Sequence, residues 1–123
     1  MPGYGNDEPP MKQSSKGYIE IYRDEQNMLR ARGKGKNRLL ATYFETDIQE
    51  DEQLGEALLQ EIRRLEQGES RRYETSGNGH NLVLTPRTAT ISSLFDDQAP
   101  ARRLKLEDFR QLLTSWLTAV RHP

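Results

Sequence analysis

The chain has 123 residues, of which 33% are hydrophobic and 30% are charged, so its length favours one small domain with a thin core. It contains no cysteine, which excludes disulfide bonds, thiolate nucleophiles and cysteine metal sites. No apolar run approaches the roughly 18 residues of a membrane-spanning helix, and the first residues lack the basic flank and apolar segment of an export signal. We therefore expect a cytoplasmic protein that does not enter a membrane.

The first part of the chain divides into a tail and three predicted strands. Residues 1–16 contain three of the six prolines and no apolar periodicity, which predicts a flexible tail before a single domain over 17–123. Two β-rich runs, over 18–22 and 28–31, are separated by turn residues and predict a hairpin. The aliphatic and aromatic residues of LLATYF (39–44) predict a third strand.

The clearest helix of the first half follows this strand. Apolar residues recur at spacings of three and four from Leu54 to Leu65, which predicts an amphipathic helix that ends at Gly68. Thr46 or Asp47 is expected to cap its start, because both side chains accept hydrogen bonds from free backbone N–H groups.

The second half repeats this order of elements. Residues 72–76 and 80–85 flank Asn78-Gly79, which predicts a hairpin with a type I′ turn. Residues 88–94 predict another strand, and residues 95–103 a polar connection.

The strongest periodic signal lies at the end of the chain. Seven apolar residues between Leu106 and Val120 share one face of a predicted terminal helix. Antiparallel hairpins and two amphipathic helices together predict an α+β fold. In this fold an antiparallel sheet from two three-stranded units carries both helices on one face, in βββα–βββα order.

Acidic residues are concentrated in one segment, since residues 45–70 hold nine acidic and two basic side chains. One interpretation is a solvated helix face. The other is a docking surface for a basic protein, because complementary potentials speed encounter and discourage wrong partners. The residues expected to form that surface are Asp47, Glu50, Asp51, Glu52 and Glu56.

Basic residues gather on the second predicted strand and the loop after it. A strand places alternate side chains on one side, and glycines let backbone amides approach an anion. The segment lacks the spacing of a phosphate-binding loop, so an ordinary exposed loop and an anion or nucleic-acid contact both stay open. The residues concerned are Arg30, Arg32, Lys34, Lys36 and Arg38.

No group of residues predicts catalysis, a metal site or a cofactor. His80 and His122 have no neighbouring ligand at metal-binding spacing. Ser76 lies near His80 but has no nucleophile elbow or orienting acid. Asp96 and Asp97 are adjacent acids in a polar loop, where nothing in the sequence separates their pKa values. We therefore expect a protein that is not an enzyme.

Three segments together resemble the YacL-type family of small bacterial proteins. They are LLATYFETDIQEDEQL, RRYETSGNGHNLVL and LEDFRQLLTSWLTAV. The resemblance spans residues 17–121 and implies a compact cytoplasmic α+β protein, but it carries no functional residue to this chain. The chain departs from the family in its longer proline-containing tail and its more basic second strand.

The preferred expectation is a non-enzymatic protein-binding module, in its most specific form a toxin-neutralising immunity or inhibitor protein. Its partner would be a basic protein, such as a toxin or nuclease domain, that meets the acidic surface. One alternative is RNA or DNA binding through the basic residues. Another is an enzyme that uses His80, which requires a concave pocket beside that residue. The oligomeric state is left open.

Overall fold

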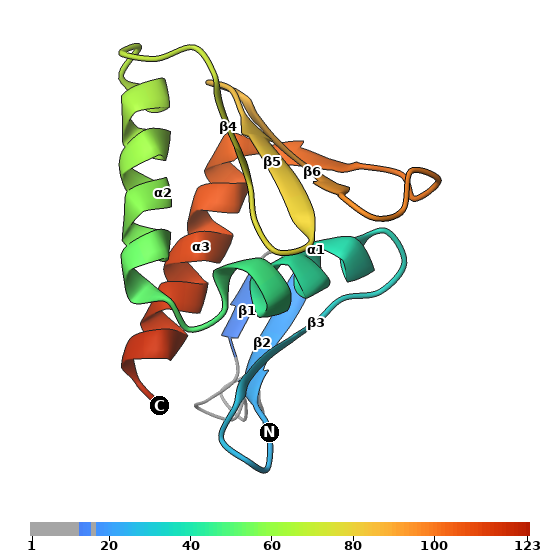
Figure 1. The fold of residues 1–123 in the computed structure, drawn as a ribbon. Coiled ribbons are helices and arrows are strands. Elements are labelled where there is room, and N and C mark those ends of the chain that lie inside the picture. Colours follow the sequence, from blue (N-terminus) through green and yellow to red (C-terminus); the bar gives the residue numbers. More distant parts are fainter. Residues whose placement is uncertain (1–12, 16) are drawn as a thin grey trace.

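The computed structural model describes residues 13–15 and 17–123, which form an α+β fold (Figure 1). Within these residues the strands make two antiparallel sheets, ordered β1-β2-β3 and β4-β5-β6-β7. The strands are β1 (Gln13–Ser15), β2 (Ile19–Arg23), β3 (Leu29–Arg32), β4 (Tyr73–Ser76), β5 (His80–Leu84), β6 (Thr88–Ser93) and β7 (Arg102–Lys105). The helices are α1 (Asn37–Tyr43), the π-helical segment η2 (Phe44–Ile48), α2 (Glu52–Glu66) and α3 (Leu106–Arg121).

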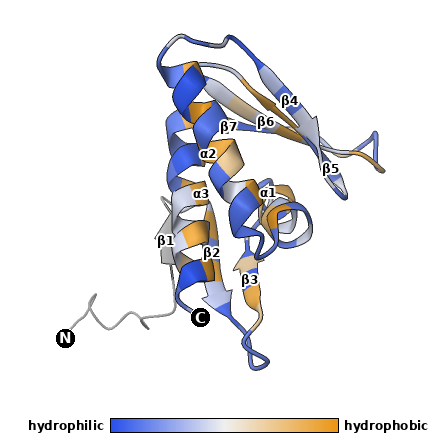
Figure 2. Ribbon diagram, turned by 60° about the vertical axis from the view of Figure 1, so that its left-hand side comes forward, coloured by the Kyte–Doolittle hydropathy of each residue, from blue (hydrophilic) through white to orange (hydrophobic). Residues whose placement is uncertain are grey.

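Helix α3 joins the two sheets. It contacts β1 and β2 of the first sheet and β6 and β7 of the second, and α2 packs against it. Figure 2 shows α2 and α3 side by side, with α1 between the two sheets. The predicted single sheet with both helices on one face is therefore wrong.

The predicted strand over 39–44 is also wrong, because this segment is helical. Leu40, Ala41, Phe44 and Ile48 are all buried, and their spacing places them on the inner face of a helix. The helix widens at its end, where the N–H of Gln49 donates to the Phe44 carbonyl oxygen five residues earlier (2.8 Å). The β propensity of LLATYF is overridden by burial between two sheets.

Two further expectations are corrected along the chain. Arg102–Lys105, at the end of the predicted polar connection, form a fourth strand, β7, on the second sheet. With the helix over 39–44, this makes the βββα–βββα order wrong. The β4–β5 hairpin is confirmed, but its turn is not type I′, since neither Asn78 nor Gly79 has a positive φ.

Both amphipathic helices are confirmed, with one change at a helix start. The N-cap of α2 is Asp51, whose carboxylate accepts from the Leu54 N–H (3.0 Å), and not Thr46 or Asp47. The predicted tail, residues 1–16, lies outside the described residues except for Gln13–Ser15, which form β1.

The core is built around aromatic side chains. Trp116 of α3 is fully buried beside Phe44, with ring centroids 5.4 Å apart, and Phe109 lies 6.0 Å from Phe44. The indole N–H of Trp116 donates to the Gln49 carbonyl oxygen (2.6 Å), so this buried polar group is satisfied. These contacts fix the end of η2 against α3.

Candidate functional site

Most of the predicted acidic surface is engaged within the chain. Glu50 forms an ion pair with Arg23 (3.2 Å), and Glu52 and Glu56 both pair with Arg121. Asp51 caps α2. The four side chains are reachable from solvent, but each already has a partner for its charge or oxygen atoms.

Two carboxylates close the free edge of β3. Glu45 accepts from the backbone N–H of Ala31 (2.7 Å), and Glu50 accepts from that of Leu29 (3.3 Å). An open strand edge is a template for pairing with another chain, and charged groups on it oppose that pairing. Part of the acidity between 45 and 56 therefore completes the first sheet.

The basic residues divide into two groups. Arg30 pairs with Glu45 and Asp24, and Arg32 pairs with Glu20 and lies over the Tyr22 ring. The remaining members form no ion pair with the described residues and are exposed. They are Lys34, Lys36 and Arg38. The nucleic-acid prediction stays untested and depends mainly on these three cations.

Asp47 does not lie on the acidic surface, since only 7% of the residue is exposed. Its carboxylate accepts from the backbone N–H groups of Gly79 (3.2 Å) and His80 (3.0 Å) and from the Thr46 hydroxyl (2.6 Å). It is also 2.9 Å from Nδ1 of His80. A Cβ at Gly77 would lie 2.3 Å from Asp47 Oδ2, so only glycine permits this approach. Asp47 thus holds the β4–β5 turn against η2.

His80 is buried, and its ring is fixed from two sides. Because the Asp47 carboxylate only accepts hydrogen bonds, Nδ1 of His80 carries the proton that lies between them. The Tyr43 ring packs edge-on against the imidazole at 5.8 Å. Burial raises the pKa of the Tyr43 phenol, and the nearby Asp47 carboxylate raises it further. The hydrogen bond to Asp47 and the contact with the Tyr43 ring thus define the orientation of the imidazole, and the hydrogen bond also defines its tautomer.

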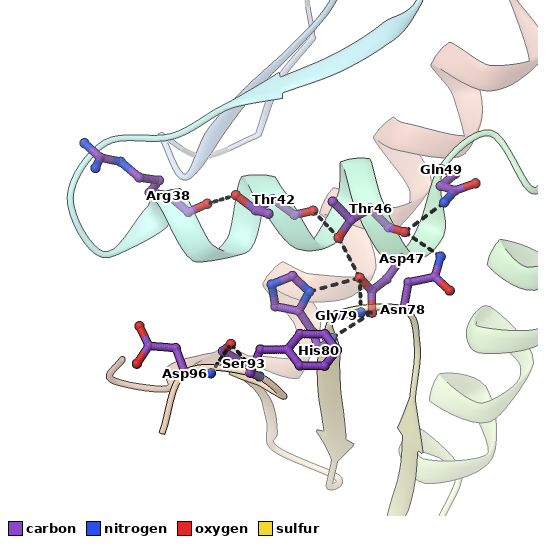
Figure 3. Close-up of polar contacts among 11 residues, drawn as sticks. Arg38, Thr42, Thr46, Asp47, Gln49, Asn78, Gly79, His80, Ser93 and Asp96 are labelled. Carbon is purple, nitrogen blue, oxygen red and sulfur yellow. Dashed lines mark hydrogen bonds and ion pairs between the residues drawn. The ribbon is translucent and has the colours of Figure 1, made fainter. Parts of the chain in front are cut away.

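A groove of about 800 Å³ lies beside this histidine, between α1 and the loop after β6. The Nε2 atom of His80 has no hydrogen-bond partner among the described residues. In Figure 3 this nitrogen lies on the side of the ring away from Asp47. The groove is lined by Arg38, Leu39, Thr42, Thr46, Asn78, Gly79, His80, Ser93, Phe95, Asp96, Ala99 and Pro100.

The loop after β6 forms the second wall of the groove. Its start is held by Ser93, whose hydroxyl accepts from the N–H groups of Phe95 (3.2 Å) and Asp96 (3.1 Å). On the opposite wall, Asn78 donates to the Thr46 carbonyl oxygen (2.9 Å) and ties the β4–β5 turn to η2 (Figure 3). Side-chain hydrogen bonds thus hold part of the backbone on each side of the groove.

Sequence reasoning identified His80 but missed its partner. Asp47 precedes His80 by 33 positions and was expected in the acidic surface. Glycines on both sides of Asn78 were the available signal, because a turn with so little side-chain volume lets a carboxylate approach its N–H groups. Ser76 points elsewhere, since its hydroxyl donates to Asn81 (2.9 Å).

Among the described residues, no three His, Cys, Asp or Glu side chains gather as a metal site would require. No described helix has both the length and the apolar character needed to cross a bilayer. Comparison of the chain with protein-family models, with curated proteins and with solved structures gave no match.

Proposed function

We propose that the groove binds a small organic ligand and that His80 is the residue that recognises it. The observation that carries the proposal is the unpartnered Nε2 of a buried imidazole that Asp47 holds in one orientation. A concave, mainly apolar site with a few convergent polar groups is the usual form of a small-molecule site, and about 800 Å³ suits a drug-sized molecule.

The proposal is for binding and not for catalysis. Covalent catalysis would need a nucleophilic side chain within hydrogen-bond reach of the histidine. Among the described residues, Asp47 is the single hydrogen-bond partner of the His80 ring. An Asp–His pair beside a groove meets the first requirement for an enzyme, but this arrangement supports recognition better.

A fragment screen followed by NMR on isotope-labelled protein tests this function. Bound fragments should shift the backbone amides of Thr46, Gly79 and Ser93, and Thr42→Trp should block them by filling the groove. Thr114→Trp is the matched control: Thr42 and Thr114 are exposed helical threonines whose hydroxyls donate to the carbonyl four residues earlier (3.0 and 2.8 Å). Fragments that bind elsewhere, or that Thr42→Trp does not affect, would contradict the proposal.

Protein binding is the second candidate, and a different surface favours it. Phe95 is 82% exposed and Leu94 is 40% exposed on the loop after β6. Asp96 and Asp97 follow at once and are also exposed. An apolar anchor beside two acids suits a basic protein partner better than carboxylates already paired with arginines. A toxin-neutralising role is the specific form of this candidate.

A binding measurement with an identified basic partner tests the second candidate. Phe95→Ala should weaken binding at least tenfold, because exposed aromatic anchors dominate many interfaces. Met28→Ala is the control, since Met28 is 54% exposed on the β2–β3 turn. A toxin gene adjacent to this one would support the immunity form. Equal effects of both variants would remove Phe95 from the interface.

The YacL-type relationship remains a proposal that depends on the three segments.

A further inference from the structure

We infer that the ligand of this groove is a small amino acid-like molecule with a hydroxyl group at one end, an apolar body, and a positive and a negative charge at the other. Tyrosine is the simplest molecule of this class. The inference depends on the proposed function of the groove and adds the chemistry of its ligand.

The inner end of the groove calls for a hydrogen-bond donor. With Nδ1–H directed at Asp47, a neutral imidazole leaves the Nε2 lone pair as an acceptor. Solvent reaches this atom from the groove, and a ligand that removes that water must replace the lost hydrogen bond, because a polar atom left unsatisfied on binding is costly. A phenol or alcohol hydroxyl supplies that bond, whereas an apolar end does not.

The walls of the groove accept an apolar body. Leu39 of α1 and Phe95, Ala99 and Pro100 of the loop line the space beside His80. Aliphatic and aromatic walls bury apolar ligand surface, and Phe95 offers a ring against which another ring can stack.

Two opposite charges lie at the open end. Arg38 lies on α1 and Asp96 on the loop, and both line the groove; Figure 3 shows them on the side of the imidazole away from Asp47, with the Arg38 guanidinium extending outward. Neither side chain forms an ion pair with a described residue. A ligand with one charge would meet a like charge on one side, but a molecule with both a carboxylate and an ammonium group matches both. The charged end of the ligand is thus assigned to the open end of the groove, and its hydroxyl group to the inner end at His80.

Four probes on the wild-type protein separate these contributions: L-tyrosine, L-phenylalanine, tyramine and 4-hydroxyphenylpropionate. In NMR titrations at neutral pH, we expect tyrosine to bind with a dissociation constant of about 1 mM or tighter. Phenylalanine, which lacks the hydroxyl, should bind about tenfold more weakly. Tyramine lacks the carboxylate and 4-hydroxyphenylpropionate lacks the amine, so each should also bind several-fold more weakly than tyrosine.

Two substitutions at His80 test the assigned hydrogen bond. His80→Asn keeps an N–H donor near Asp47 but has no atom at the Nε2 position, so it should remove the preference for tyrosine over phenylalanine. His80→Gln places an amide oxygen near the Nε2 position and should restore part of it. At the open end, Arg38→Gln should weaken tyrosine several-fold, whereas Lys36→Gln, an exposed cation outside the groove, should not.

The outcomes distinguish this inference from the function on which it depends. If tyrosine and phenylalanine bind equally, or if tyrosine does not shift the groove amides while other fragments do, the ligand class is wrong and the groove remains a binding site. If no fragment and no probe binds, both fail. The comparison of probes on the wild-type protein decides the question even if a His80 variant does not fold.

Discussion

Asp47 makes several of the contacts that hold the β4–β5 turn, because its one carboxylate accepts from two backbone N–H groups, a hydroxyl and the His80 ring. Removing it leaves several donors without an acceptor in a buried place. We expect Asp47→Ala to lower the free energy of unfolding by about 3 to 5 kcal/mol, as when one partner of a buried polar pair is removed. Urea denaturation measures this.

Asp51→Ala is the matched control for Asp47→Ala. Asp51 also accepts from a backbone N–H, that of Leu54, but it is an exposed helix cap. Its loss should cost about 1 kcal/mol. Similar losses for the two variants would show that the Asp47–His80 contact adds little to stability.

Tyr43 predicts a fall in stability at alkaline pH. Burial raises the pKa of its phenol in the folded state, with a further contribution from Asp47. The unfolded phenol has a pKa of about 10, so the stability from the neutral buried form is fully present below about pH 10 and is lost above it. The free energy of unfolding should fall by up to about 1.4 kcal/mol per pH unit through this group.

Tyr43→Phe isolates this effect, because the Tyr43 hydroxyl has no hydrogen bond to the described residues. Urea denaturation between about pH 9 and pH 11 should show a shallower fall for the variant than for the wild type. Tyr18, whose pKa burial also raises, is present in both proteins and cancels in the comparison. Parallel pH profiles would contradict the assignment.

The long helices and one hairpin could be predicted from the sequence, whereas α1 and η2 could not. Both long amphipathic helices and the strands β4, β5 and β6 were predictable. In each of these elements the apolar residues recur with one period, either that of a helix or that of a strand. The segment LLATYF was not, since its residues suit a strand by propensity and a helix by position. Its conformation depends on its contacts with the two sheets that it separates, and these contacts cannot be deduced from the local sequence pattern.

Helices α2 and α3 approach closely at one glycine. A Cβ at Gly55 would lie 2.4 Å from Cδ2 of the buried Leu117. In most helix interiors Gly→Ala stabilises by up to about 1 kcal/mol. Here we expect Gly55→Ala to destabilise by about 1 to 3 kcal/mol, because the buried Leu117 side chain would have to shift to make room for the added methyl group.

A double-mutant cycle measures this contact. Leu117→Ala alone removes buried surface and should cost about 2 to 5 kcal/mol. In the double variant the new methyl group at position 55 occupies part of the space left by the Leu117 side chain. The double variant should therefore lose less free energy of unfolding than the two single variants lose together. Strict additivity in thermal or urea unfolding would show that the helices do not meet at Gly55.

At the scale of the whole molecule, the candidate site was only half accessible from sequence. His80 and the glycines before it lie in one hairpin, so their proximity followed from the turn. Asp47 comes from another element, and its position depends on the helical segment over 39–48, whose first part, 39–44, was predicted to be a strand. The acidic segment was recognised by its charge, but charge does not show which carboxylates bind the chain's own arginines and strand edge.

Trp116 makes a prediction about the cooperativity of the entire fold. Its helix, α3, contacts both sheets, and its indole N–H holds the Gln49 carbonyl oxygen at the end of η2. Trp116→Ala should therefore cost about 3 to 5 kcal/mol and weaken both sheets together. Trp116→Phe keeps most of the packing and loses the hydrogen bond, so about 1 to 2 kcal/mol is expected.

Native-state hydrogen exchange distinguishes a shared core from two separate ones. If α3 couples the sheets, the amides of β2 and β5 should lose protection by equal factors in Trp116→Ala, because both then exchange through the same global opening. Protection lost in one sheet and retained in the other would mean that each sheet is stable without α3. The groove lies between α1 and the loop after β6, so equal loss would also tie its geometry to Trp116, and Trp116→Ala should then bind groove ligands more weakly than Trp116→Phe.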